Sequence, residues 1–178
     1  MKVLLEGLLP RCFPGMDFLC ISHEGKNDLE KSIPRKLRAW QEPGVRFVIV
    51  RDNDGGNCRQ LKEHLVKMCR EADRDDTLIR IAVQELEAWY FGEPEALAEA
   101  FCRDDLRDIG RKARYRNPDR IERPSRELAR LLVPDFHKIS GARKMAAHLD
   151  PGRNRSGSFS AFVKGVERIW AEIGDHRR

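Results

Sequence analysis

One short segment, residues 47–56 (FVIVRDNDGG), limits what this chain can fold into more than any other. A short apolar run that is rich in β-branched residues and bounded by turn residues is typical of a strand buried on both faces. In an open α/β sheet, ligands bind just beyond the carboxyl ends of such strands. The segment therefore predicts a parallel α/β sheet with Asp52 and Asp54 at its ligand-binding edge.

The two aspartates of this segment point to a divalent cation. Carboxylates this close together repel each other, and oxygen ligands suit hard cations such as Mg²⁺ or Mn²⁺. Gly55 and Gly56 follow directly and allow a sharp turn and the close approach of a substrate. We therefore expect Asp52 and Asp54 to be metal ligands.

The residues from Asp52 to Gly55 allow other interpretations. One is a solvated turn, since Asp, Asn and Gly all favour turns. A calcium loop of the EF-hand type is excluded because Gly56 occupies the position of its third oxygen ligand. Phosphatases of the haloacid-dehalogenase type also place an Asp-x-Asp after an apolar strand. This chain resembles them weakly, because they have Thr or Val where Gly56 stands.

The first residues can be interpreted in two ways. As a strand, residues 3–5 would bring Glu6 and Gly7 to the edge of the sheet. As a helix, residues 1–9 carry their apolar side chains on one face. We favour the helix, because too few residues separate Gly7 from the next strand for a parallel crossover.

Strands and helices are predicted to alternate on either side of residues 47–56. We expect a strand over 17–21, which ends in a polar loop on the same edge as Asp52. Lys26 in that loop could meet a phosphate. A helix follows, capped by Asn27 or Asp28, that kinks or begins anew near Pro34. A helix over 58–70 and a strand over 78–83 complete this part.

Two glutamates follow the strand at 78–83. If that strand neighbours the central one, Glu85 or Glu87 arrives beside Asp52 and Asp54. At helical spacing the two side chains point apart, so one of them would reach a shared cation. We favour Glu85 as the third catalytic acid, because it is nearer the strand end, and keep Glu87 as a further metal ligand. The other glutamate would be a first-turn residue favoured by the helix dipole.

The remainder, residues 93–178, is predicted to be mostly helical. Helices are expected over 94–102, 124–133 and 140–149, with a last helix capped by Ser158 and an irregular, charged stretch over 103–119. Lys138 and Arg143 flank the start of the 140–149 helix, which Ser140 is predicted to cap, and could hold an anion there. Around Tyr115, several basic residues could contact phosphates, although a solvated basic surface is the alternative: Arg111, Lys112, Arg114 and Arg116.

Composition narrows the class of protein. A length of 178 residues suits one domain, 1–178, with a core over about 1–92 and a helical part over about 93–178. The net charge of +5 suits a protein that handles polyanions such as nucleic acid. Five scattered cysteines without a C-x-x-C pair fit a reducing, cytoplasmic environment. The apolar runs are too short to cross a membrane.

Several motifs, in order, resemble one family. They are His-Glu-Gly-Lys-x-Asp-Leu at 23–29, Val-Arg-Asp-Asn-Asp-Gly at 50–55, Glu-Leu-Glu-Ala-Trp-Tyr at 85–90, Lys-Ile-Ser-Gly-Ala-Arg at 138–143 and Asn-Arg-Ser-x-Ser-Phe at 154–159. Together they resemble the Toprim-like domain-of-unknown-function family numbered 4276. The resemblance spans almost the whole chain.

The resemblance implies a chemistry and a set of site residues. Toprim domains, including those of topoisomerases, primases and overcoming-lysogenisation-defect nucleases, bind Mg²⁺ through a glutamate and an Asp-x-Asp for phosphoryl transfer on nucleic acid. By likeness, Asp52 and Asp54 are metal ligands, with Glu85 or Glu87 as a further acid. A role in defence against foreign DNA, with a protein partner in such a system, is a family-level expectation.

One departure from the family pattern is visible. Family members usually begin with a strand that carries a glutamate, followed by the first helix. Residues 1–9 resemble that helix, so we expect the strand and its glutamate to be missing from this sequence. The sequence therefore predicts a Mg²⁺-dependent nuclease, with a catalytically degenerate binding module or a phosphatase as alternatives.

Overall fold

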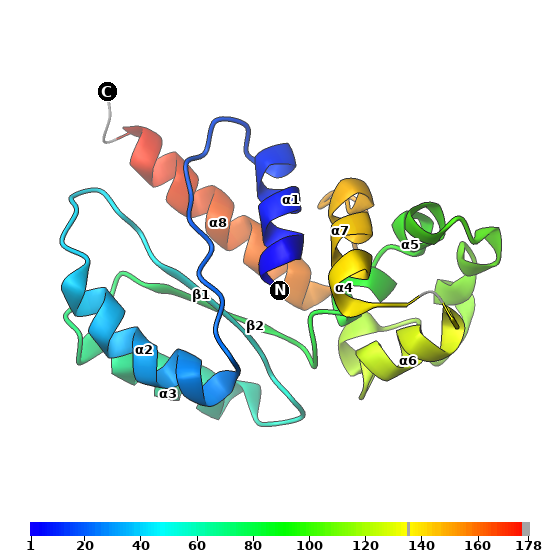
Figure 1. Cartoon of the computed structure of the whole chain (residues 1–178), viewed down its shortest axis with the longest axis horizontal. Coiled ribbons are helices and arrows are strands. Elements are labelled where there is room, and N and C mark those ends of the chain that lie inside the picture. Colours follow the sequence, from blue (N-terminus) through cyan, green and yellow to red (C-terminus); the bar gives the residue numbers. More distant parts are fainter. Residues whose placement is uncertain (135, 176–178) are drawn as a thin grey trace.

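Two parallel strands form the sheet of this α/β fold (Figure 1). A computed structural model describes residues 1–134 and 136–175. Strand β1 (Val48–Asp52) pairs with β2 (Leu78–Ala82) in a register that sets Asp52 opposite Ala82. Helix α3 (Cys58–Arg70) connects them, as a parallel pair requires. The predicted small parallel sheet with flanking helices is confirmed.

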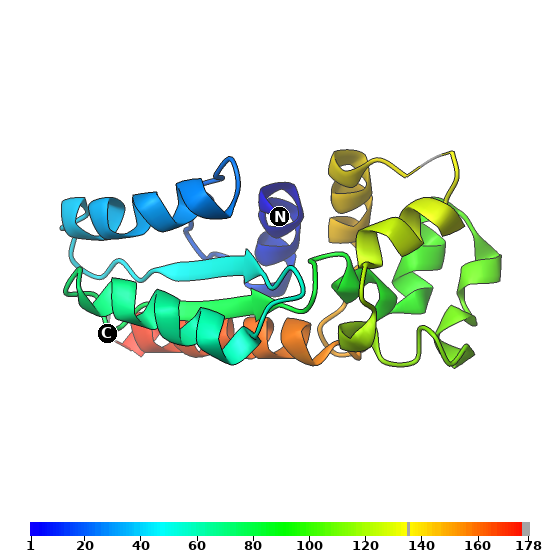
Figure 2. The same cartoon turned by 90° about the horizontal axis from the view of Figure 1, so that it is seen from below.

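Helices cover both faces of the sheet (Figures 1 and 2). On one face, Ile49 and Ile79 pack with α2 (Lys26–Ala39) and α3. On the other face, α8 (Gly157–Asp175) lies along β2, and Nε of Arg80 donates a hydrogen bond to the carbonyl of Ala161 (2.7 Å). The alternation of side chains in β1 thus directs Val50 and Asp52 to the α8 side.

Helix α1 (Lys2–Cys12) packs closely on α7 (Lys138–His148). This confirms the predicted helix over residues 1–9. Gly7 lies at the crossing, where an added Cβ would come within 2.7 Å of the Cβ of Ala146. Arg11 closes the contact by donating from Nη1 to the carbonyl of Ala146 (2.6 Å).

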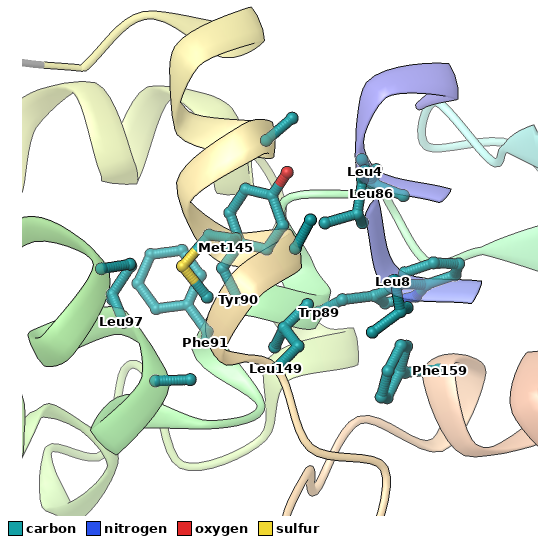
Figure 3. Packing of buried hydrophobic residues seen from close by; sticks show 14 of the residues in the cluster. Leu4, Leu8, Leu86, Trp89, Tyr90, Phe91, Leu97, Met145, Leu149 and Phe159 are labelled. Carbon is teal, nitrogen blue, oxygen red and sulfur yellow. The ribbon is translucent and has the colours of Figure 1, made fainter. Parts of the chain in front are cut away.

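The larger hydrophobic cluster lies in the helical part. Its centre is the fully buried run Trp89, Tyr90 and Phe91, which lies in α4 (Ala88–Phe91) (Figure 3). Around it lie α5 (Pro94–Phe101), α6 (Pro124–Leu131) and three short 3₁₀ turns (Asp104–Leu106, Ile109–Arg111 and Pro118–Arg120). Among the helices described, none is long and apolar enough to span a bilayer.

Two expectations for the first part of the chain are corrected. Residues 17–21 are not a strand: the segment is extended, with Phe18 and Cys20 against the core and Leu19 and Ile21 exposed, but it is not paired into the sheet. The extended conformation agrees with the prediction, whereas a strand also requires a partner. The helix predicted to break at Pro34 runs through that residue as one element.

Three predicted helix caps are also wrong. Helix α2 has Gly25 as its N-cap, so Asn27 and Asp28 lie inside its first turn. Helix α7 begins at Lys138 with His137 as its N-cap, so Ser140 lies inside the first turn and its hydroxyl donates to the His137 carbonyl (3.3 Å). At α8 the cap is Ser156, whose Oγ accepts from the amide of Phe159 (3.2 Å). Asp119, which is distant in sequence, accepts from the amide of Ser158 (2.9 Å) and selects this start.

Tyr115 is a core residue, contrary to the prediction that it could lie among phosphate-contacting residues. It is 3% exposed, and its ring stacks on Phe91 with centroids 5.1 Å apart. Its hydroxyl donates to Oε2 of Glu127 (2.8 Å). The tyrosine is therefore not available to stack on a base.

Candidate metal centre

Asp52 ends β1 at the carboxyl edge of the sheet, where the chain leaving β2 crosses over it. The amide of Leu86 donates to Oδ1 of Asp52 (2.8 Å). The parallel register places Ala82 beside Asp52, so the loop that follows β2 must pass this carboxylate. The side chain of Asp52 is thus held in place by Leu86, which lies in the loop after β2.

The two loops beyond the strands are joined by further hydrogen bonds. Oε1 of Gln84 accepts from Nδ2 of Asn53 (2.7 Å) and from the amide of Gly55 (2.9 Å). The amide of Asp54 donates to the carbonyl of Gln84 (3.0 Å). Asn53 is 5% exposed, and Gly55 has a φ of +78°, which glycine adopts without strain. These contacts make a rigid base for the acidic residues.

The charges at this edge act on one another. Burial, together with the negative charges of Glu87 and then Asp54, raises the pKa of Asp52 from 3.8 to about 6, against the opposing hydrogen bond from Leu86. Glu87 is 7% exposed, whereas Asp54 is exposed. A buried carboxylate next to like charges favours protonation or a cation. The carboxylates at this edge therefore disfavour one another's ionised form.

The two glutamates separate, as their spacing predicts. Oε2 of Glu85 accepts from the amide of Ser125 (2.7 Å), so this carboxylate satisfies the first turn of α6. Glu87 is the one whose charge acts on Asp52, and its Oε1 lies 3.8 Å from Nζ of Lys138. The structure thus brings Glu87 to Asp52 and directs the favoured Glu85 to α6.

One of the three predicted anion-binding residues lies near the acidic residues. Lys138 approaches through its contact with Glu87, from the first residue of α7. Lys26, which is the first residue of α2, is exposed, and so is Arg143, which lies farther along α7. Lys138 is therefore the cation that the fold places at the acidic residues.

The donor set was compared with the needs of a divalent cation. Across residues 1–134 and 136–175, no group of three or more His, Cys, Asp or Glu side chains could hold a metal ion. A closed cage of protein ligands therefore does not fit. Mg²⁺, however, is commonly held by one or two carboxylates together with water and substrate phosphates. Asp52 and Glu87, whose negative charges act on each other, fit this open type of site.

A serine–histidine–aspartate cluster elsewhere does not form a catalytic triad. His23 contacts Oδ2 of Asp28 through Nδ1 (3.1 Å), and the Oγ of Ser32 is nearly equidistant from the two ring nitrogens, 3.3 Å from Nδ1 and 3.4 Å from Nε2. In a triad, the serine hydroxyl bonds to the one ring nitrogen that the acid does not contact. Ser32 is also 3% exposed and donates to the carbonyl of Leu29 (2.9 Å). The cluster therefore stabilises the start of α2.

Comparison with known proteins identifies a family. No curated protein and no solved structure matched this chain. The sequence model of one family, described as a domain of unknown function (DUF4276), matches residues 1–167. This match covers nearly all of the 178 residues, including the acidic edge and α7. The chain therefore belongs to the DUF4276 family.

Proposed function

We propose that this chain is a Toprim-like, metal-dependent phosphodiesterase that acts on nucleic acid. One observation carries the proposal: at the carboxyl edge of a parallel sheet, the buried carboxylates of Asp52 and Glu87, from two loops, lie near enough for the charge of Glu87 to act on Asp52. Ligand sites occur at this edge in open α/β sheets. Asp54, exposed beside Asp52, would contact the cation or its water shell.

The residues have separate roles in this proposal. Asp52 and Glu87 would hold Mg²⁺ or Mn²⁺, and the amide of Leu86 orients the Asp52 carboxylate. The cation, when bound, supplies charge neutralisation at the phosphate and activation of a water molecule. Lys138, held near Glu87, is placed to pair with a phosphate oxygen once the cation neutralises Glu87.

The substrate class follows from charge and from the family resemblance. The net charge of +5 and the exposed Lys26, Lys138 and Arg143 favour a polyanion. The Toprim likeness favours nucleic acid over small phosphate esters. A cytoplasmic role in defence against foreign DNA, with a protein partner, belongs to the same proposal.

The direct test is cleavage of single- and double-stranded DNA and RNA with Mg²⁺ or Mn²⁺. We expect cleavage that EDTA abolishes and that Asp52→Asn and Glu87→Gln each reduce at least a hundredfold, on the order expected when a group that stabilises transition-state charge is removed. Glu85→Gln is the matched control, because Glu85 contacts Ser125 instead of Asp52. Undiminished cleavage by Asp52→Asn and Glu87→Gln would reject the site.

A second candidate is a binding module without catalysis. It is favoured by the engagement of Glu85 at α6 and by the lack of a three-carboxylate group in the part of the chain described. Calorimetry with Mg²⁺ and nucleic acid separates the candidates. Tight binding of nucleic acid by protein that never cleaves it would support the binding module.

A further inference from the structure

Residues 116–126, which lead into α6, carry four exposed arginines against two acids. The arginines are Arg116, Arg120, Arg123 and Arg126, and the acids are Asp119 and Glu122. Within residues 1–134 and 136–175, none of the four guanidinium groups has an ion-pair or hydrogen-bond partner. Other arginines of this part are paired: Arg111 with Asp108, and Arg114 with Glu127. The four arginines therefore present positive charge directly to solvent.

The backbone of residues 116–126 is held in place from two sides. Oδ1 of Asp119 accepts from the hydroxyl of the buried Ser156 (2.7 Å), so this acid is engaged by the start of α8. The amide of Ser125 donates to Oε2 of Glu85 (2.7 Å). Only side chains need to be ordered when a ligand binds to such a surface, which lowers the cost of binding.

The same contacts place these arginines beside the candidate metal centre. Glu85, which anchors Ser125, is separated from Glu87 by one residue. Helix α4 begins directly after Glu87 and contacts both α6 and the 3₁₀ turn Pro118–Arg120. Figures 1 and 2 show α6 beyond the ends to which the two strands point. The arginines thus belong to the side of the fold that follows the carboxyl edge of the sheet.

The start of α6 is an unfavourable place for cations unless an anion binds there. Arg123 is the N-cap of α6, and Arg126 lies in its first turn. The N-terminal end of a helix is the positive end of its dipole and disfavours nearby cations. The acid of the same turn, Glu127, is already paired with Arg114 and Arg130. Helix dipole and arginines therefore add to one positive potential.

We propose that residues 116–126 form a surface that binds the phosphate backbone of nucleic acid through these four arginines. Guanidinium groups pair with phosphate oxygens, and such contacts position a nucleic acid without reading its sequence. The inference rests on the proposed function for the fate of the bound strand, which the surface would lead to the cation at Asp52 and Glu87. Binding to the arginines itself needs no cation, so it can be measured apart from cleavage.

The test is the binding of fluorescein-labelled DNA and RNA oligonucleotides, followed by anisotropy in EDTA over a series of salt concentrations. Arg123→Gln/Arg126→Gln should weaken binding about tenfold or more and make the slope of log affinity against log salt shallower by about two. Arg35→Gln/Arg70→Gln is the matched control. It also removes two exposed arginines without partners, from the second half of α2 and the end of α3. The control should keep the wild-type slope.

A second variant and a stability measurement separate binding from folding. Arg116→Gln/Arg120→Gln should change the slope as the first variant does. Both variants should unfold at the wild-type temperature or slightly above it, because the replaced side chains have no partners in the described part of the chain. A wild-type slope in both variants, or a loss of binding equal to that of the control, would overturn the surface. An unfolding temperature that both variants lower would do the same, since it would assign the arginines to the fold.

The outcomes distinguish this surface from the proposed function. If the wild type cleaves DNA or RNA with Mg²⁺ while the variants keep its salt slope, the surface is overturned and the proposed function stands. If the variants lose binding but the wild type cleaves nothing with Mg²⁺ or Mn²⁺, the surface stands and the proposed cleavage is overturned. A wild-type protein that binds neither DNA nor RNA in EDTA would overturn the surface.

Discussion

The amide of Leu86 donates a 2.8 Å hydrogen bond to Oδ1 of Asp52, across 34 residues of sequence. This bond connects the end of β1 to the loop after β2 and holds the carboxylate in the field of Glu87. Asparagine at position 52 can accept the same bond. Asp52→Asn therefore removes the charge of the residue while keeping its position.

The raised pKa of Asp52 predicts how stability changes with pH. Because the folded protein holds the proton more tightly than the unfolded chain, this contribution is complete below pH 3.8 and is lost as the pH rises to about 6. Asp52→Asn should therefore be more stable than the wild type at pH 7, by up to about 3 kcal/mol.

Urea denaturation from pH 4 to pH 7.5 checks this pH dependence. The difference in unfolding free energy between Asp52→Asn and the wild type should shrink toward zero near pH 4. Saturating Mg²⁺ should remove most of it at pH 7.5, because the cation compensates the charge. A difference that does not vary with pH would show that burial does not shift the titration of Asp52.

Glu85 is predicted to stabilise the start of α6. Its carboxylate accepts from the Ser125 amide (2.7 Å), so Glu85→Ala should lower the unfolding free energy by about 1–2 kcal/mol. Glu63→Ala is the control, because Glu63 lies on an exposed face of α3 and its ion pair with Arg59 contributes about 0.5 kcal/mol or less. Similar urea midpoints for the two variants would contradict the role of Glu85.

The α1–α7 contact depends on the absence of a side chain at Gly7. An alanine there would bring its Cβ to within 2.7 Å of Ala146, so Gly7→Ala should destabilise the fold by about 1–3 kcal/mol. Gly174 lies in α8 with open space around it, and Gly174→Ala should be neutral or stabilising by up to about 1 kcal/mol. The thermal unfolding temperatures of the two variants measure these effects. A Gly7→Ala variant that is more stable than the wild type would contradict the close α1–α7 contact.

Asp119 is expected to hold the start of α8 in place. It accepts from the hydroxyls of Ser156 (2.7 Å) and Ser158 (3.1 Å) and from the Ser158 amide (2.9 Å). Asp119→Ala removes the acceptor of these three hydrogen bonds and should cost about 2–3 kcal/mol. Asp108→Ala, at an exposed ion pair with Arg111, should cost little. If chemical denaturation shows equal losses of unfolding free energy in Asp119→Ala and Asp108→Ala, a special role for Asp119 is excluded.

Local patterns in the sequence predicted much of the fold. The β-branched run before Asp52 gave a strand, and helix α3 has the predicted bounds 58–70 because its apolar periodicity is uninterrupted. The segment 17–21 was predicted as a strand and is extended, but local sequence does not reveal whether a partner strand lies alongside.

The candidate site required information from distant residues. Local pattern favoured Glu85, which is nearer the strand end, but the residue that draws Glu85 away is Ser125, which lies 40 residues beyond it. Likewise, Ser156 and Ser158 can both cap a helix, and Asp119 decides between them.

Calorimetric titration of Mg²⁺ at pH 7.5 tests the central claim most directly, because it asks whether Asp52 and Glu87 form one cation site. We predict one Mg²⁺-binding event in the wild type and in Glu85→Gln. In Asp52→Asn and in Glu87→Gln, the Mg²⁺ affinity should fall at least tenfold. Mg²⁺ binding that survives in Glu87→Gln but disappears in Glu85→Gln would contradict a cation site formed by Asp52 and Glu87.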